Sequence, residues 1–266
     1  PVPSRNRVFL FSTQSIFMNN NNLQQRYELY TTDDFKVWQT LYDRQINYLQ
    51  MHAAKNYLDA IEAIAFNRHV IPHFGDTTVR LQQATGWQLK VVPNLVPQDE
   101  FFTALSQRIF PATAWLRSYE QIDYIEEPDM FHDVFGHVPL LMNADYAAFM
   151  EGIGQLAMQW MHNPHAISLL GRMYWFTIEF GLMQEQDELK LYGAGIMSSL
   201  AEANNALGTA SAKHVFDLRQ MLHTNYRTDI LQDTYFTITS FGQLYQSLPA
   251  MDAALKAIVK DEVLIT

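Results

Sequence analysis

Apolar residues recur at helical spacing along most of this 266-residue chain, and this pattern limits the folds that it can adopt. The first such stretch follows Thr32 and Asp33, which are candidate capping residues. Its shared apolar face consists of Phe35, Trp38, Leu41, Tyr42 and Leu49. We therefore predict a helix here, and the same spacing predicts several more.

The other helices are predicted from this periodicity and from residues that start or stop helices. Asp99 and Asn143 are predicted to cap two of them, and Gly86 to close another. The predicted helical ranges are 57–64, 77–86, 99–110, 144–160, 164–183, 213–223 and 250–260. Short strands are predicted at 87–93 and 188–193, and residues 230–239 are predicted to be partly extended. Because strands and helices do not alternate regularly, the expected fold class is mainly α with a few short β-strands.

The chain is expected to form a single domain, because no linker rich in Pro, Gly or Ser divides it. Residues 1–30 are predicted to be a loosely ordered N-terminal extension, with a polar loop at Met18–Asn22. Residues 31–266 are predicted to hold the folded domain. Hydrophobic residues make up 48% of the chain, so a domain of this length can bury a sizeable core.

Charge and cysteine content exclude several functions. The formal net charge is −10 and Lys and Arg do not cluster, which argues against nucleic acid or a membrane surface as partner. No apolar run predicts a transmembrane helix, and no signal peptide is recognised. The lack of cysteine excludes disulfides, thiolate metal sites and a cysteine nucleophile, and suits the cytoplasmic location that we expect. Any metal must therefore be held by His, Asp, Glu or water.

Two histidines, His132 and His137, are candidate metal ligands with an unusual spacing. On a regular α-helix, residues five positions apart lie about 140° apart, so the helix must deform or stop between them if they bind one ion. Asp129 would open this helix, whereas Gly136 and Pro139 favour its end or a bend. The alternative is that both are ordinary core histidines.

Glu179 is the candidate third ligand, because a carboxylate in so apolar a segment needs a partner. A metal ion would be one; a polar face shared with Thr177, or a pair with Arg172, is the alternative. Trp175 lies four residues earlier and would face the same way. Two His and one carboxylate fit either zinc or non-haem Fe(II), and a zinc hydrolase would use a base such as Asp133.

Two other histidine pairs are weaker candidates. His69 and His73 are interrupted by Pro72, and His162 and His165 flank a proline in a predicted loop.

Three motifs together resemble the catalytic domain of the pterin-dependent aromatic amino acid hydroxylases. They are EEPDMFHDVFGHVPLL (126–141), YWFTIEFGL (174–182) and YGAGIMSS (192–199). The likeness includes 85–102 and 235–241, extends weakly to 37–45, and is greatest to the short bacterial phenylalanine hydroxylases. It therefore covers about residue 30 to 250.

The resemblance implies a catalytic iron- and pterin-binding domain over residues 31–266. It implies Fe(II) held by His132, His137 and Glu179, a tetrahydropterin and O₂ as co-substrate. One oxygen atom would go to the pterin and one to the aromatic ring of phenylalanine, giving tyrosine. Tyrosine or tryptophan hydroxylation is the alternative within the family; outside it, a zinc hydrolase or a helical binding module is possible.

The resemblance also implies roles for other residues. Those that would contact the pterin are Leu95, Val96, Phe101, Asp133 and Tyr174. Those that would contact or support the amino acid are Arg117, Pro128, Trp175, Phe180, Gly195, Ser198 and Glu202. Arg117 would pair with its carboxylate.

Three positions depart from the pattern of the animal enzymes. Asp133 stands where they usually have Glu, Asn94 replaces a glycine, and Ile125 stands where they carry a threonine. These changes concern affinity and substrate choice. No counterpart of their oligomerisation helix is recognised, so a monomer or dimer with small-molecule partners is expected.

Overall fold

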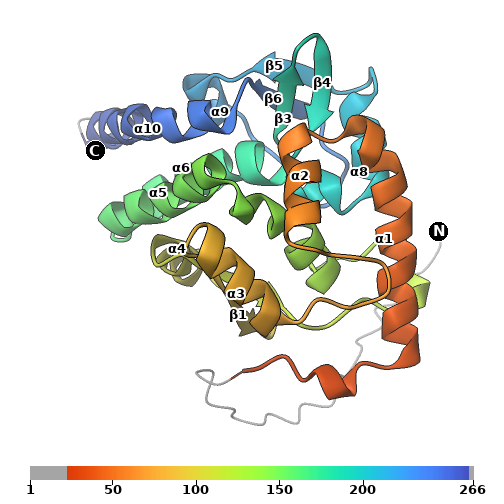
Figure 1. Ribbon diagram of the computed structural model, residues 1–266. Coiled ribbons are helices and arrows are strands. Elements are labelled where there is room, and N and C mark those ends of the chain that lie inside the picture. The colour runs from red at the N-terminus through yellow and green to blue at the C-terminus, as the bar shows by residue number, and fades with distance from the viewer. Residues whose placement is uncertain (1–22, 264–266) are drawn as a thin grey trace, which may run out of the picture.

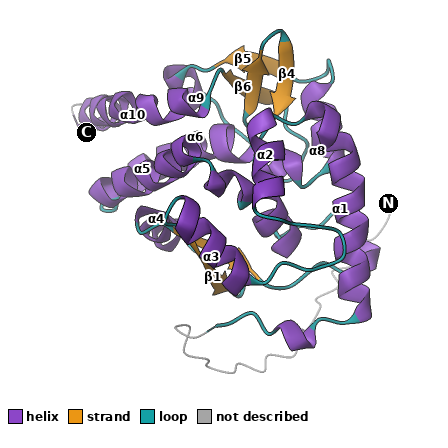
Figure 2. Cartoon of the chain, viewed as in Figure 1, coloured by secondary structure: helices purple, strands orange, loops and turns teal. Residues whose placement is uncertain are grey.

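The computed structural model describes residues 23–263, and most of them are helical (Figure 2). The α-helices are α1 (Thr32–His52), α2 (Lys55–Ala63), α3 (Phe74–Ala84), α4 (Gln98–Ser106), α5 (Ala144–Trp160), α6 (Pro164–Tyr174), α7 (Ala194–Met197), α8 (Leu200–Leu207), α9 (Leu218–His223) and α10 (Phe241–Val263). The strands are β1 (Gln88–Val92), β2 (Ile109–Thr113), β3 (Leu182–Glu185), β4 (Glu188–Leu191), β5 (Ala212–Val215) and β6 (Thr234–Ile238). The predicted mainly α fold class is confirmed.

Helices α5, α6 and α10 run side by side, and α4 packs on α5 (Figure 1). The start of α5 follows from its sequence, because the Asn143 side chain accepts the backbone N–H groups of Asp145 and Tyr146, each at 3.1 Å. This confirms the predicted cap. The buried apolar residues of all these helices belong to one continuous core cluster, as expected for a single domain.

Two small sheets flank the helices. Strands β1 and β2 pair in parallel, and the second sheet has the order β4-β3-β6-β5. Within it β3 is antiparallel to β4 and parallel to β6. Figure 1 shows this four-stranded sheet at one end of the molecule, beside α1 and α2. The strands predicted at 87–93, 188–193 and 230–239 are confirmed.

The helix predicted at 250–260 begins at Phe241, and three other predicted helical ranges include strand residues at one end. Helix α4 ends at Ser106 instead of Phe110, and Arg108 adopts a left-handed φ of 57° before β2 begins. Helix α6 ends at Tyr174 and the segment then changes geometry, while 182–185 becomes strand β3. Residues 212–215 form β5 instead of helix. Each of these strands is fixed by pairing with a distant strand, which local periodicity does not report.

Two predicted caps also differ. Helix α1 is capped by Thr31, one residue before the predicted pair, in a capping box with Asp34. Asp99 lies inside the first turn of α4 after Pro97, so it is not a cap. Its charge there still favours the helix, because the helix N-terminus is partially positive.

The described part of the predicted N-terminal extension contacts the domain. The Gln25 side chain donates to the Pro72 carbonyl at 2.9 Å, and the Tyr30 hydroxyl donates to the Ala114 carbonyl at 2.5 Å. The predicted loop at Met18–Asn22 lies outside the described residues. Among residues 23–263, no helix combines the length and apolarity that crossing a membrane requires.

Candidate metal centre

The segment that carries both histidines is a π-helix, Phe131–His137. A π-helix forms i→i+5 hydrogen bonds, so its wider turn brings residue i+5 round to nearly the same side as residue i. The Nε2 atoms of His132 and His137 consequently lie 3.3 Å apart. The helix therefore deforms between the histidines, as binding of one ion would require, and it does not stop at Gly136.

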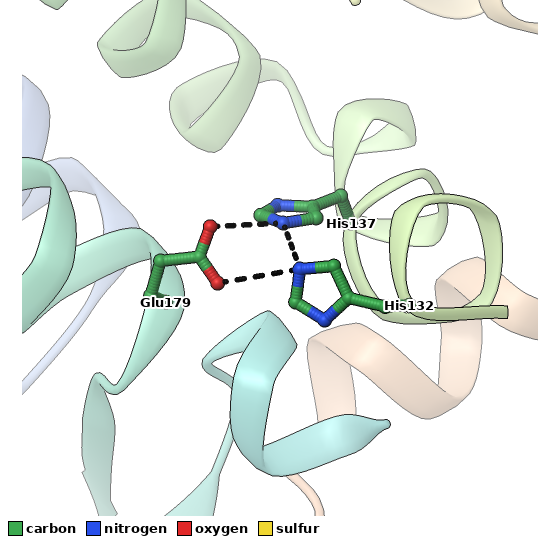
Figure 3. Close-up of side chains that lie close together, drawn as sticks. All are labelled: His132, His137 and Glu179. Carbon is green, nitrogen blue, oxygen red and sulfur yellow. Dashed lines mark hydrogen bonds and ion pairs between the residues drawn. The ribbon is translucent and has the colours of Figure 1, made fainter. Parts of the chain in front are cut away.

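Glu179 reaches the same point from a second π-helix, Trp175–Glu179, which continues α6. Its carboxylate oxygens lie 3.1 Å from Nε2 of His137 and 3.6 Å from Nε2 of His132 (Figure 3). The alternative partners are engaged elsewhere: Arg172 donates to the Leu222 carbonyl and Thr177 to the Met173 carbonyl. Two segments far apart in sequence thus place three donor groups together.

The three side chains are the one group of this kind in the described part of the chain, with ligand atoms within 4.8 Å of one another. Of the four histidines proposed as weaker candidates, His73 stacks on Tyr27 and His162 stacks on Trp160. Two imidazole nitrogens and one carboxylate, without cysteine, suit a zinc or a non-haem iron ion. The donor set therefore fits a metal.

Ser198 sets the orientation and the tautomer of His132. Its hydroxyl donates to the Ala194 carbonyl at 2.9 Å and lies 2.9 Å from Nδ1 of His132. Since the hydroxyl donates its one proton to the Ala194 carbonyl, the Ser198 oxygen accepts a hydrogen bond from the protonated Nδ1 of His132. Nε2 of His132 is then unprotonated and free to bind a cation, which is how an outer hydrogen bond prepares a metal ligand.

Burial and charge adjust the ionisation of the group. Burial lowers the pKa of His132 to about 4, although the carboxylate of Glu179 acts in the opposite direction. Burial alone would raise the pKa of Glu179, but His137 and His132 bring it below its ordinary value. At neutral pH the site therefore presents a neutral imidazole at His132 and an ionised carboxylate, which are the forms that bind metal.

Asp133 lies beside the histidines but is held by another element. Thr113, at the end of β2, donates to its Oδ2 from the backbone N–H at 2.7 Å and from the hydroxyl at 2.8 Å. Burial raises the pKa of Asp133 to about 7 despite these hydrogen bonds. Its carboxyl group is thus fixed by β2 beside the two histidines.

Comparison with known proteins decides the family. The sequence model of the biopterin-dependent aromatic amino acid hydroxylases matches residues 6–260. The chain belongs to this family. It is 42% identical over 226 residues to the phenylalanine-4-hydroxylase of Ralstonia nicotianae, covering 85% of this chain and 72% of that protein.

Solved structures of a bacterial relative have the same fold as this chain. Phenylalanine hydroxylase from Chromobacterium violaceum with bound oxidised Fe(III) is 38% identical, with a TM-score of 0.86 over 91% of this chain and 88% of that one. The same enzyme with iron(III) and the oxidised cofactor 7,8-dihydrobiopterin is 39% identical, with a TM-score of 0.85 and the same coverage. The predicted family resemblance is confirmed.

A cavity opens over the three candidate ligands of this hydroxylase-family chain. The residues predicted to contact cofactor or substrate that line it are Leu95, Val96, Phe101, Pro128, Asp133, Tyr174 and Trp175. Phe101 meets Tyr174 edge to face, with ring centroids 5.2 Å apart. The cavity wall thus includes several aromatic rings, which suits a flat, apolar ligand.

Other residues that were predicted to contact or support the substrate pack behind this wall or beside it. Phe180 packs on Trp175 with centroids 4.6 Å apart, and a Cβ on Gly195 would lie 2.7 Å from the Phe180 ring. Arg117 is buried and forms a bidentate ion pair with Asp129, at 2.8 and 2.9 Å. The same Asp129 carboxylate accepts the backbone N–H of His132 at 3.2 Å, as its predicted place at the start of that helix requires.

Sequence reasoning missed several cavity residues. Phe110 is the last residue of the predicted helix 99–110 and Thr113 lies just beyond it, but both belong to strand β2; Gln98 comes from the start of α4. Tyr226 lies in a loop without periodicity, and its ring stacks on Trp175 with centroids 4.3 Å apart. No local signal marks Tyr226, because only the fold brings it to the cavity.

Proposed function

We propose that this chain is a phenylalanine 4-monooxygenase that converts L-phenylalanine to L-tyrosine with Fe(II), a tetrahydropterin and O₂. The observation that carries the proposal is the convergence of His132, His137 and Glu179 below an aromatic cavity. The names of the relatives, which are phenylalanine hydroxylases with iron and a pterin, support the choice of metal and substrate.

His132 and His137 would hold the iron through Nε2, and Glu179 through its carboxylate. When bound, iron and the reduced pterin supply the activation of O₂. The protein contributes three ligands on one side, which leaves other coordination positions for oxygen and water. Ser198 keeps Nδ1 of His132 as the protonated nitrogen, so the ligand nitrogen stays available.

The pterin would lie against Phe101 and Tyr174, with Leu95 and Val96 contacting it through their backbone. Phe101 offers a ring face for stacking, since its edge-to-face contact with Tyr174 fixes the ring. Asp133 would bind a polar edge of the pterin, because its carboxyl lines the cavity and is already oriented by Thr113.

The amino acid would be held at both ends. Nε and Nη2 of Arg117 donate to the Asp129 carboxylate. We assign the substrate carboxylate to the remaining guanidinium nitrogen of Arg117, Nη1. Trp175 and Pro128 would contact the aromatic ring. The residues that would support this pocket are Phe180, Gly195, Ser198 and Glu202.

The decisive assay supplies Fe(II), a tetrahydropterin and each of phenylalanine, tyrosine and tryptophan, and measures the hydroxylated product. We expect tyrosine from phenylalanine as the main product, with Glu179→Ala losing it. A clear preference for tryptophan or tyrosine would replace the substrate but keep the chemistry. Activity with zinc and none with iron, or near wild-type hydroxylation by Glu179→Ala, would overturn the proposal.

We also propose that residues 31–266 form the catalytic domain, that the chain acts as a monomer or dimer, and that it works in the cytoplasm. The lack of cysteine supports a reducing location. Sedimentation at several protein concentrations tests the oligomeric state, a truncation at residue 31 that keeps activity tests the domain boundary, and cell fractionation tests the location.

A further inference from the structure

The loop between α9 and β6, residues 224–233, contacts the indole of Trp175 at two places. The Tyr226 ring stacks on it, with centroids 4.3 Å apart and an interplanar angle of 17°. The side-chain oxygen of Gln232 accepts the indole N–H at 2.9 Å. One loop thus fixes both the face and the polar edge of a side chain that lines the cavity.

Gln232 has the contacts needed to fix that loop. Its amide nitrogen donates to the carbonyl groups of Arg227 at 2.8 Å and Ile230 at 3.1 Å, which closes the loop on itself. Its backbone N–H donates to the Glu202 carboxylate at 3.2 Å, and its carbonyl accepts from Asn205 at 2.6 Å. Because only 6% of Gln232 is exposed, losing these partners would leave buried polar groups unpaired.

Tyr226 is the main apolar anchor of the same loop, because its half-buried ring also meets the Phe176 ring edge to face, with centroids 6.0 Å apart. Ile230 and Leu231 are 46% and 49% exposed, so they contribute little to the core. The loop also has no regular secondary structure between α9 and β6. Its position therefore depends on the hydrogen bonds of Gln232 and on the packing of Tyr226 against Trp175 and Phe176.

We propose that Gln232 is a positioning residue that holds loop 224–233 against Trp175 and so sets the shape of the wall that receives the substrate ring. This rests on the proposed function insofar as the ring belongs to an aromatic amino acid. A fixed indole leaves a defined width between the wall and the metal ligands. A loosened one binds phenylalanine more weakly and discriminates less against the larger tryptophan ring.

The test compares the full-length protein with Gln232→Leu, Gln232→Glu and the control Gln155→Leu, an exposed glutamine on α5. Gln232→Glu keeps an oxygen for Trp175 but loses both amide donors, so it separates the two contacts. The first readout is trypsin cleavage after Arg227, whose side chain is 64% exposed, measured by mass spectrometry as the fragment that begins at Thr228. The second is the separate change of KM and kcat for phenylalanine, with the ratio of tryptophan to phenylalanine turnover.

For Gln232→Leu we expect cleavage after Arg227 to be roughly tenfold faster, KM for phenylalanine to rise roughly tenfold, and kcat to stay within about twofold. Gln232→Glu should speed cleavage as much but raise KM less. Gln155→Leu should match wild type. Unchanged cleavage and KM in Gln232→Leu, or a fall in kcat with KM unchanged, would overturn the proposal.

Two further outcomes are distinguishable. If Gln232→Leu does not fold, Gln232→Glu carries the test, and wild-type cleavage in that variant counts against the proposal. If the wild-type protein shows no hydroxylase activity, the proposed function fails, while cleavage after Arg227 still reports whether Gln232 holds the loop.

Discussion

Nδ1 of His132 lies 2.9 Å from the hydroxyl of Ser198, which joins the π-helix Phe131–His137 to the segment after α7. The Ser198 hydroxyl donates its proton to the Ala194 carbonyl, so in the hydrogen bond with His132 the Ser198 oxygen is the acceptor. The position of α7 therefore determines which nitrogen of His132, a candidate ligand, carries the proton.

Ser198→Ala should therefore weaken metal binding without removing a ligand. Loss of such an outer contact typically lowers metal affinity about 10- to 100-fold, because the imidazole can rotate or change tautomer. Competition with a chelator for Fe(II) or Co(II) measures the change. Ser106→Ala, which removes a hydroxyl that donates to the Thr103 carbonyl on α4, is the control. A competition curve identical to wild type for Ser198→Ala would show that Ser198 does not orient the ligand.

Gly136→Ala should destabilise the protein and disturb the same region. A Cβ at Gly136 would lie 2.8 Å from the Ala194 carbonyl oxygen, so α7 would have to move. Overpacking of this kind costs about 1–3 kcal/mol. Urea unfolding measures it, and Gly75→Ala on α3 is the matched control, since nothing lies within 4 Å of a Cβ there. Equal unfolding free energies for the two variants would contradict the close approach.

Much of the fold follows from local sequence. The apolar period of α1 and α5, the cap at Asn143 and the stop after α3 at Gly86 are each set by residues within one or two turns. The candidate ligands could also be predicted from the sequence. His132 and His137 can bind one ion only if their helix deforms or stops, and Glu179 is a carboxylate in an otherwise apolar segment.

The remainder depends on contacts between distant segments. The first two residues of β2 fall in the helix predicted at 99–110, and only pairing with β1 brings Thr113 to Asp133. Gly136 was predicted to favour a helix end or a bend, whereas its lack of a side chain also permits the close approach of α7, which local sequence does not report. Tyr226 and Gln232 lie more than 40 positions from Trp175, so no local pattern connects them.

Asp129→Asn should destabilise the protein strongly. Its carboxylate neutralises the buried guanidinium of Arg117 and also accepts the backbone N–H of His132. Removing one partner of a buried pair leaves an uncompensated charge, at about 3–5 kcal/mol. Urea unfolding measures this loss of unfolding free energy. The control is Asp229→Asn, which breaks an exposed ion pair with Arg227 and should leave the unfolding free energy unchanged. A small loss in Asp129→Asn would mean that water or another group already compensates Arg117.

Glu202 should make stability depend on pH. Burial raises the pKa of its carboxyl, although the Tyr235 hydroxyl and the Gln232 backbone N–H donate to it. The folded state therefore binds a proton more tightly than the unfolded state. This contribution to stability is complete below the unfolded pKa, near 4.5, and is lost as pH rises through the higher folded value.

Glu202→Gln removes this titration and keeps an oxygen acceptor for the Gln232 N–H. We expect the unfolding free energy of wild type, relative to Glu202→Gln, to fall as pH rises from about 4.5 toward 7. Urea unfolding at several pH values, with the exposed Glu62→Gln as control, provides the comparison. A difference that is constant with pH, or that grows in favour of wild type as pH rises, would mean that the hydrogen bonds to Glu202 outweigh its burial.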